Sequence, residues 1–252
     1  VALTKTDRAP PERIAEVMTE TQALLAPTSL SGAQIIETAA LAGIGITELD
    51  QALQSLEPSE SRDEGAFRLA VDRVFTLRGV GLIATGTVFS GRLKVGDELL
   101  ISPAGLPVAA RGLHAQNRPA ETAGTGTRCA INLVGRHAGE KNLKRGDWLV
   151  GEDAHLPSNR IDALVQLAIG EDDPIRHDTP VHVHIGAADI PGRIALLESR
   201  RLNPGETALA QLVLDRETTC VHGDRLILRD QTARRTLAGG RVIDPLGAVR
   251  GR

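Results

Sequence analysis

The chain has 252 residues, a formal net charge of −3, and 41% hydrophobic and 24% charged residues, which is ordinary for a soluble protein of two or three small domains. No apolar stretch approaches the roughly 20 residues that span a bilayer, and we find no secretory signal, so the composition argues against a membrane protein or a membrane partner. The two cysteines, Cys129 and Cys220, form no CxxC motif and no disulfide framework, which fits a cytoplasmic protein.

Charge is distributed unevenly along the chain. Residues 1–65 carry 4 basic and 11 acidic side chains, residues 66–155 carry 12 and 8, and residues 156–252 carry 13 of each. The middle third is the only basic part, which suggests a local surface where a polyanion could dock. A mildly basic, solvated surface would explain the same bias.

Residues 1–58 read as an α/β segment. Val1-Ala2-Leu3 has the pattern of the end of a buried strand, and Ile35-Ile36 suggests a second short strand. After the first strand, Pro10-Pro11 predicts the start of a helix. A second helix is predicted from apolar residues at helical spacing after the second strand, and Pro58 ends it.

The pattern changes after residues 59–65, which have the small, polar composition of a linker. Phe67, Leu69 and Val71 alternate with Arg68, Ala70 and Asp72, as in a half-buried strand, and short β runs follow with turn residues between them. The pattern predicts two consecutive small β-barrels, over 66–155 and 156–252. The later runs lie at Leu82–Phe89, Glu98–Ser102, Val108–Leu113, Arg128–Val134, Asp147–Val150, Ile161–Ile169, Val181–Ile185, Arg193–Glu198, Ala208–Asp215, Asp224–Leu228 and Thr236–Val242.

Two short motifs in the α/β segment point to a guanine nucleotide. Thr4-Lys5-Thr6-Asp7 has the form of the [NT]KxD element of GTPases, in which the carboxylate accepts hydrogen bonds from N1–H and the exocyclic amine of guanine. A four-residue match also occurs by chance. Thr38-Ala39-Ala40 strengthens the interpretation because it follows a short strand and precedes a glycine turn, as the last nucleotide loop of a GTPase does, where backbone N–H groups contact the guanine oxygen.

The phosphate-binding motif G-x-x-x-x-G-K-[ST] is absent from the sequence. No Mg²⁺-binding Ser, Thr or Asp can be assigned, and no residues form a recognisable catalytic set. If residues 1–58 come from a GTP-binding domain, we expect them to be only its C-terminal part, and we do not expect this chain alone to hydrolyse GTP.

The run from Gly86-Thr87-Val88 to Lys94-Val95-Gly96-Asp97 resembles the second domain of translational GTPases of the elongation factor Tu type. A finer resemblance, over essentially the whole chain, is to the selenocysteine-specific elongation factors. The segments that carry it are Phe67 to Thr76, Leu113 to Asn117, Asn142 to Trp148, Asp224 to Asp230 and Thr236 to Gly240. The chain departs from the family in lacking the phosphate-binding half of the GTP-binding domain and the C-terminal winged helices.

This resemblance implies a mainly β fold, with two β-barrels preceded by an α/β remnant of a P-loop GTPase domain. It implies GTP as cofactor, with Mg²⁺ in the intact family, bound here through Thr4, Lys5, Asp7, Thr38, Ala39 and Ala40. It also implies delivery of selenocysteinyl-tRNA to the ribosome at recoded UGA codons, by a monomer whose missing C-terminal region would bind the mRNA hairpin.

Within the first barrel, the family's positions imply that Asp72, Arg73 and Arg128 line the pocket for the selenocysteinyl end of the tRNA. His114, with Gln116 and Asn117, lies in a polar loop that could contact the tRNA end or could simply close a turn. An exposed Asp–Arg pair without a ligand is the alternative for the first three residues.

Other interpretations remain open. The chain could belong to another elongation factor Tu-like or initiation-type factor, or could be a non-enzymatic barrel module that docks on RNA or the ribosome. His182 and His184 share a strand face, with His177 or His222 as a conceivable third ligand, but the sequence shows no convergence, so we predict no metal site.

Overall fold

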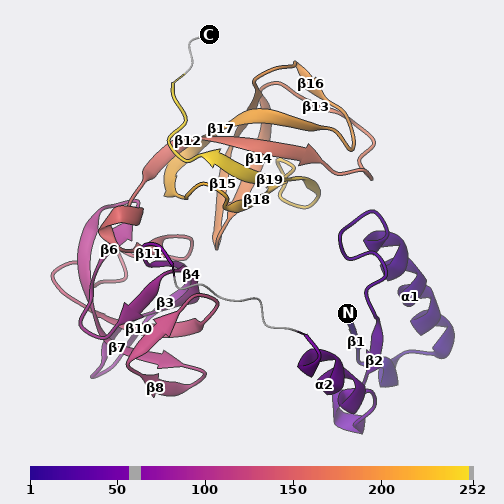
Figure 1. Cartoon of the computed structure of the whole chain (residues 1–252), viewed down its shortest axis with the longest axis horizontal. Coiled ribbons are helices and arrows are strands. Elements are labelled where there is room, and N and C mark those ends of the chain that lie inside the picture. Colours follow the sequence, from indigo (N-terminus) through magenta and orange to yellow (C-terminus); the bar gives the residue numbers. More distant parts are fainter. Residues whose placement is uncertain (57–63, 250–252) are drawn as a thin grey trace. The chain divides into compact units, whose positions relative to one another are not determined.

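The computed structural model describes residues 1–56 and 64–249. The chain divides into two compact units, Val1–Glu60 and Ser61–Arg252, which are described separately (Figure 1). Residues 59–63 of the predicted linker and Pro58, the predicted helix stop, lie outside the described residues. No helix among the described residues is both long and apolar enough to cross a membrane.

The first unit has one two-stranded parallel sheet. Strands β1 (Ala2–Thr4) and β2 (Ile36–Thr38) pair with Thr4 opposite Thr38. Its helices are η1 (Thr6–Arg8), α1 (Pro11–Leu25), η2 (Ala40–Ala42) and α2 (Ile46–Gln54). Proline is tolerated at the start of α1 because the first N–H groups of a helix have no hydrogen-bond partner within it, so the missing N–H of proline costs no helical hydrogen bond.

The expectation of a buried first strand was wrong. No residue of β1 is fully buried, because β2 is its only strand partner among the described residues. The helix α1 also buries none of its residues completely.

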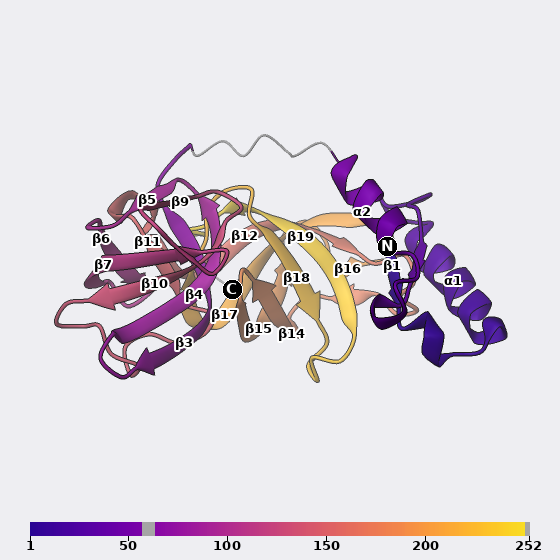
Figure 2. The ribbon, with the colours of Figure 1, turned by 90° about the horizontal axis from the view of Figure 1, so that it is seen from below.

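The second unit holds the two predicted barrels, and both are closed six-stranded rings (Figure 2). In the first, the order β10-β4-β3-β11-β6-β7 closes through pairing of β7 with β10. Three short strands lie outside that ring. The bounds are β3 (Arg68–Leu77), β4 (Gly81–Ser90), β5 (Arg92–Lys94), β6 (Glu98–Ser102), β7 (Leu106–Ala115), β8 (Arg118–Ala120), β9 (Thr122–Gly124), β10 (Arg128–Val134) and β11 (Trp148–Val150).

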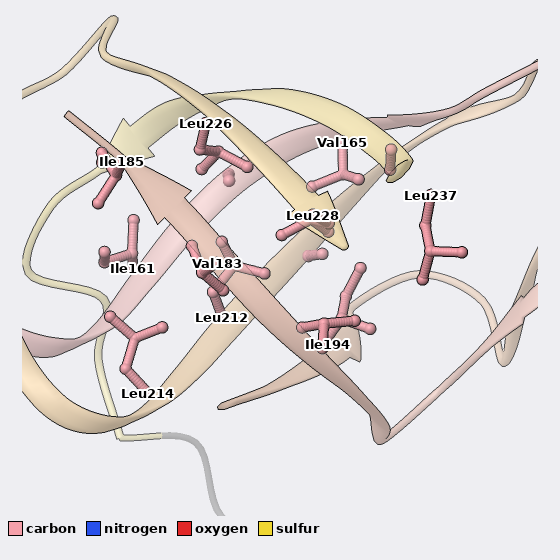
Figure 3. Close-up of a cluster of buried hydrophobic side chains, with 14 of the residues drawn as sticks. Ile161, Val165, Val183, Ile185, Ile194, Leu212, Leu214, Leu226, Leu228 and Leu237 are labelled. Atoms are coloured by element: carbon pink, nitrogen blue, oxygen red, sulfur yellow. The ribbon is translucent and has the colours of Figure 1, made fainter. Parts of the chain in front are cut away.

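The second barrel has the order β12-β17-β15-β14-β18-β19, with β19 pairing back to β12. Its core is built from aliphatic side chains, several of which are drawn in Figure 3. The bounds are η3 (Glu152–Ala154), β12 (Pro157–Leu167), β13 (Ile175–Arg176), β14 (Thr179–Ile185), β15 (Ala188–Leu196), β16 (Arg201–Leu202), β17 (Thr207–Thr219), β18 (Arg225–Arg229) and β19 (Thr236–Asp244).

The predicted strand runs agree with the structure to within a few residues at most of their ends, and Pro157 begins β12. Proline fits there because the first residue of a strand can lack an N–H donor. The five short strands β5, β8, β9, β13 and β16 were not predicted, because segments of two or three residues show no alternation.

The alternation predicted for Phe67–Asp72 is only half right. Leu69 and Val71 point into the core as expected, but Arg68 and Ala70 are also buried. Both faces are covered there because the second barrel contacts the outside of this strand: Arg68 Nη1 donates to Asp224 Oδ1 at 3.0 Å, and Nη2 donates to Oδ2.

Trp148 completes this contact between the barrels. The Arg68 guanidinium carbon lies 4.6 Å from the centroid of the indole ring, and Trp148 is 1% exposed. Gly186, between β14 and β15, allows the indole to approach, because an added Cβ would lie 2.5 Å from the Trp148 ring. Ser102 of the first barrel and Thr219 of the second are also joined by a hydrogen bond.

We predict that Asp224→Asn lowers the free energy of unfolding of the second unit by about 3–5 kcal/mol, because it leaves the buried Arg68 charge unpaired. Urea denaturation followed by the fluorescence of Trp148, the sole tryptophan, measures this. The control Asp178→Asn removes an exposed pair with Arg193 and should cost less than about 1 kcal/mol. Equal losses in the two variants would contradict the prediction.

Candidate functional site

The two predicted nucleotide motifs lie next to each other at the carboxyl ends of β1 and β2. Thr6 Oγ1 donates to the Thr38 carbonyl and Thr38 Oγ1 donates to the Leu3 carbonyl, both at 3.3 Å. Lys5 and Asp7 are exposed beside them, and Lys5 has a left-handed backbone with φ 61°. The parallel pairing therefore brings together two segments more than thirty residues apart in the sequence.

The two alanines of the second motif differ. Ala39 is 1% exposed, and its N–H donates to the Ile44 carbonyl at 3.0 Å. That donor is therefore not available to a ligand. Ala40, at the exposed start of η2, is the alanine whose backbone can face a nucleotide.

The larger candidate site is a groove of about 1160 Å³ on the outer face of the first barrel. It crosses strands β3, β4, β7 and β10, whose neighbours are the pairs β3–β4, β4–β10 and β10–β7. No acidic side chain is among the described residues that line it. The lining includes cationic or ionisable groups (Arg111, His114 and Arg128), apolar groups (Phe75, Leu77, Val80 and Ile83) and the amide of Asn132.

Strand register explains why these side chains share one face. Ala130 of β10 pairs with Thr85 of β4 on one side and with His114 of β7 on the other. Residues directly opposite one another in a sheet point the same way, and residues two apart along a strand do so as well. Arg128 and Asn132 therefore point outward with His114, while Cys129 and Ile131 point into the core.

Arg128 is held at one end of the groove by Asp72, which in turn accepts a hydrogen bond from Thr85. Its Nε donates to Asp72 Oδ2 and its Nη2 donates to Asp72 Oδ1, both at 3.1 Å. Thr85 Oγ1 donates to the same Asp72 Oδ1 at 2.6 Å. The Arg128 side chain stays 57% exposed and Asp72 30% exposed, so the guanidinium is fixed in direction but remains open to a ligand.

A β-bulge at Asp72 keeps both Asp72 and Arg73 on the outer side of β3. Val71 pairs with Gly86 and Arg73 pairs with Thr85, so Asp72 is an extra residue. Bulges change the direction of side chains next to binding sites. Both Val71 and Val74, three apart, contact the core, while Asp72 and Arg73 lie on the outer side.

All four predicted residues lie on the outer face of the first barrel, but only two of them line the groove. Asp72, Arg128 and His114 belong to one face, and Arg128 and His114 line the groove. Arg73 is exposed and lies opposite Thr85, on the same face, but it is not among the residues that line the groove. Thr85, Arg111 and Asn132 were not predicted, although alternation within the predicted runs Leu82–Phe89 and Arg128–Val134 was a usable signal for Thr85 and Asn132.

A thiol lies directly beneath this site. Burial raises the pKa of Cys129 to about 11, and this effect outweighs the opposing attraction of the neighbouring Arg128 charge. The neutral thiol therefore does not compete with an anionic ligand for Arg128. Burial likewise raises the pKa of Cys220 to about 12.

His182 and His184 both approach Asp189, with His184 Nε2 3.8 Å from Asp189 Oδ1, but the other two histidines considered as ligands do not join them. His182 Nδ1 lies 2.7 Å from Asp189 Oδ1, whereas His177 and His222 bond the carbonyls of Leu196 and Ile243. Burial is the main reason that the pKa of His184 is lowered. Within residues 1–56 and 64–249, no group of three or more His, Cys, Asp and Glu side chains could hold a metal ion.

We predict that iodoacetamide modifies neither cysteine of the folded protein at about pH 8, because only about 0.1% of a thiol with a pKa near 11 is thiolate there. Mass spectrometry of the digested protein measures the modification of each cysteine separately. The same reaction in concentrated urea is the control and should label both. Rapid labelling of Cys129 in the folded protein would contradict the burial argument.

Comparison with known proteins finds relatives that match almost the whole chain. A family model described as "Selenocysteine-specific elongation factor, beta-barrel domain" matches residues 162–248. The chain is 40% identical over 243 residues to the selenocysteine-specific elongation factor of Escherichia coli (strain K12), covering 96% of this chain and 38% of that protein. For the Desulfomicrobium baculatum protein of the same name the identity is 39% over 249 residues, covering 98% of this chain and 39% of that protein.

Solved structures give the same fold. Translation elongation factor SelB from Methanococcus maripaludis in its apo form matches with a TM-score of 0.81 at 24% identity, covering 97% of this chain and 58% of that one. Its complex with the GTP analogue GPPNHP matches with a TM-score of 0.77 at 22% identity, with the same coverage. The chain spans about two fifths of the length of the curated relatives. It belongs to the family of selenocysteine-specific elongation factors.

Proposed function

We propose that this chain is the part of a cytoplasmic, GTP-dependent elongation factor that holds the aminoacyl end of selenocysteinyl-tRNA on its way to the ribosome. The observation that carries the proposal is the fixed Arg128 at one end of a groove without acidic lining residues. The amino acid would lie against Arg128, in the open groove on the outside of the first barrel.

Charge would distinguish selenocysteine from its closest analogues. A selenol is more acidic than a thiol, so selenocysteine is mostly an anion near neutral pH, whereas a cysteine thiol has a pKa near 8.5 and serine stays neutral. A guanidinium is always charged and presents a planar set of donors. A hydrogen bond to a charged group contributes about 1.5–3 kcal/mol, which is roughly a tenfold to hundredfold preference.

Asp72 and Thr85 would act by orienting Arg128. Both Asp72 oxygens already accept from Arg128, so the carboxylate fits the role of a positioning group better than that of a receptor for the free α-amino group. Nη1 of Arg128 has no hydrogen-bond partner among the described residues, and it is the donor we assign to the selenolate. A guanidinium that is already oriented loses less conformational entropy when the ligand binds.

Arg73 and His114 would have secondary roles. Arg73 lies on the same face two strands away from Arg128, so its flexible side chain could add positive charge near the amino acid. His114, opposite Ala130, lies between the Arg128 end and the Asn132 end of the groove and would contact the terminal ribose.

The first unit would contribute the guanine-reading part of the GTP site. Thr4 and Thr38 end β1 and β2. Lys5 and Asp7 would lie against the nucleotide after the first strand, and Ala39 and Ala40 would do so after the second, with Asp7 reading the base and Ala40 rather than Ala39 presenting its backbone. Binding of the phosphates and Mg²⁺ would require residues outside this chain's recognisable motifs. The GTP-bound state would close the factor around the tRNA until hydrolysis.

A general elongation factor is the competing function, because it shares the barrels but needs no preference for an anionic amino acid. We predict that Arg128→Ala in the full-length protein lowers the preference for selenocysteinyl-tRNA over seryl-tRNA roughly ten- to hundredfold, since one charged hydrogen bond is lost. Equilibrium binding of the two tRNAs, with GTP and a reductant present, measures the ratio.

The control for this experiment is Arg136→Ala, which removes an exposed cation of the same barrel that does not line the groove. It should leave the ratio unchanged. Equal affinities of the wild-type protein for the two tRNAs, unaffected by Arg128→Ala, would rule out selenocysteine recognition and favour the general factor.

We also predict that Asp7→Asn in the full-length protein shifts nucleotide preference from GTP toward xanthosine triphosphate. The amide offers a donor to the exocyclic oxygen of xanthine, where the carboxylate would otherwise accept from the guanine amine. Competition binding of the two nucleotides measures the shift. An unchanged preference would remove Asp7 from the base-reading role.

A further inference from the structure

Arg111 is a second arginine in the groove of the first barrel, and amino-acid recognition leaves it unused. It lies in β7, is exposed, and is one of the residues that line the groove. Its side chain takes part in no hydrogen bond or ion pair among the described residues. Arg128, in contrast, is neutralised by Asp72. Of the two arginines that line the groove, Arg111 is therefore the one whose positive charge is not balanced by a carboxylate.

A β-bulge directs Arg111 into the groove. Asn132 of β10 pairs with Gly112 and Leu133 pairs with Ala110, so Arg111 is an extra residue in β7. Arg111 and His114 are three positions apart and would lie on opposite faces of a regular strand. The bulge lets both line the groove, while Ala110 and Leu113 remain in the core.

The two arginines lie at opposite ends of the groove. Arg128 and Asn132 are four residues apart along β10, which corresponds to roughly 13 Å at about 3.3 Å per residue. Gly112 and Arg111 lie beside Asn132 on the next strand. This span suits an aminoacyl ester at the Arg128 end, a nucleoside over the middle, and a phosphodiester at the Arg111 end.

We propose that Arg111 binds the phosphodiester on the 5′ side of the terminal nucleoside of the aminoacylated RNA. This rests on the proposed function, because the ligand is the same aminoacyl end. The apolar residues Phe75, Leu77 and Ile83 form the part of the groove across β3 and β4, where a nucleobase can pack while its phosphate faces β7. A contact to a phosphate is the same for every nucleic-acid sequence, so it raises the affinity for the RNA end without selecting one amino acid over another.

The two arginines would therefore have separable effects. Arg128 governs which amino acid is bound, and Arg111 governs how tightly any aminoacylated RNA end is bound. Since Arg111 neutralises one phosphate, it should also contribute about one unit to the dependence of the logarithm of affinity on the logarithm of salt concentration.

The experiment measures binding of selenocysteinyl-tRNA and seryl-tRNA to the full-length protein with GTP at several salt concentrations. The variants are Arg111→Ala, Arg111→Lys and the control Arg136→Ala, an exposed cation outside the groove. We expect Arg111→Ala to weaken both tRNAs by the same factor, about tenfold, with a smaller salt dependence. Arg111→Lys keeps the charge and should restore the salt dependence and most of the affinity, which a folding defect would not allow.

Other outcomes overturn the proposal in distinct ways. Unchanged affinity and salt dependence in Arg111→Ala would make Arg111 an ordinary solvated side chain. A changed ratio between the two tRNAs would make it a reader of the amino acid, and an equal loss in Arg136→Ala would indicate a diffuse charge effect. If the wild-type protein binds neither tRNA, the proposed function itself fails. If the wild-type protein binds and Arg111→Ala leaves the affinity and its salt dependence unchanged, only this inference fails.

Discussion

Closure of a six-stranded barrel with a filled interior is the constraint on which the candidate site depends. Leu69, Val71, Ile101 and Ile131 occupy the inside of the first barrel, so no ligand can bind there, and recognition has to occur on the outer face. Strict alternation would give each strand only every second residue for that face. The two β-bulges, at Asp72 in β3 and at Arg111 in β7, relax this limit and add charged residues to the outer face without opening the core.

The charges gathered in this way are not equivalent. Arg128 is bound on two of its nitrogens by Asp72, which is in turn bound by Thr85, so it offers a directed donor with little net charge. Arg111 has no such partner among the described residues and offers net charge with little direction. A directed donor discriminates between an anionic and a neutral side chain, whereas an undirected charge attracts any phosphate. One groove can therefore separate selectivity from affinity.

The contact between the barrels supplies the rigid frame for this surface. Arg68 belongs to β3, the strand that carries Asp72. The Arg68 side chain is held by Asp224 of the second barrel and by the indole of Trp148. Displacing the second barrel would leave a buried charge unpaired, which costs several kcal/mol, so the position of β3 is tied to the assembly of both barrels. The aliphatic interiors of the two barrels stabilise the fold, but they do little to fix the orientation of one barrel against the other, because hydrophobic contacts are not directional.

The amino-acid sequence by itself determined the two barrels and their longer strands, because alternation and turn residues are local properties. It also indicated that the loops after Val1–Leu3 and Ile35–Ile36 could form one nucleotide site, and the parallel pairing of Thr4 with Thr38 brings them together. Only the tertiary structure decided that Arg68 is buried, because Asp224 is 156 residues away in the chain. It alone also decided that Arg111 faces the groove of the first barrel. A bulge is a property of two paired strands, and a single strand read in isolation cannot reveal which residue its neighbour leaves unpaired.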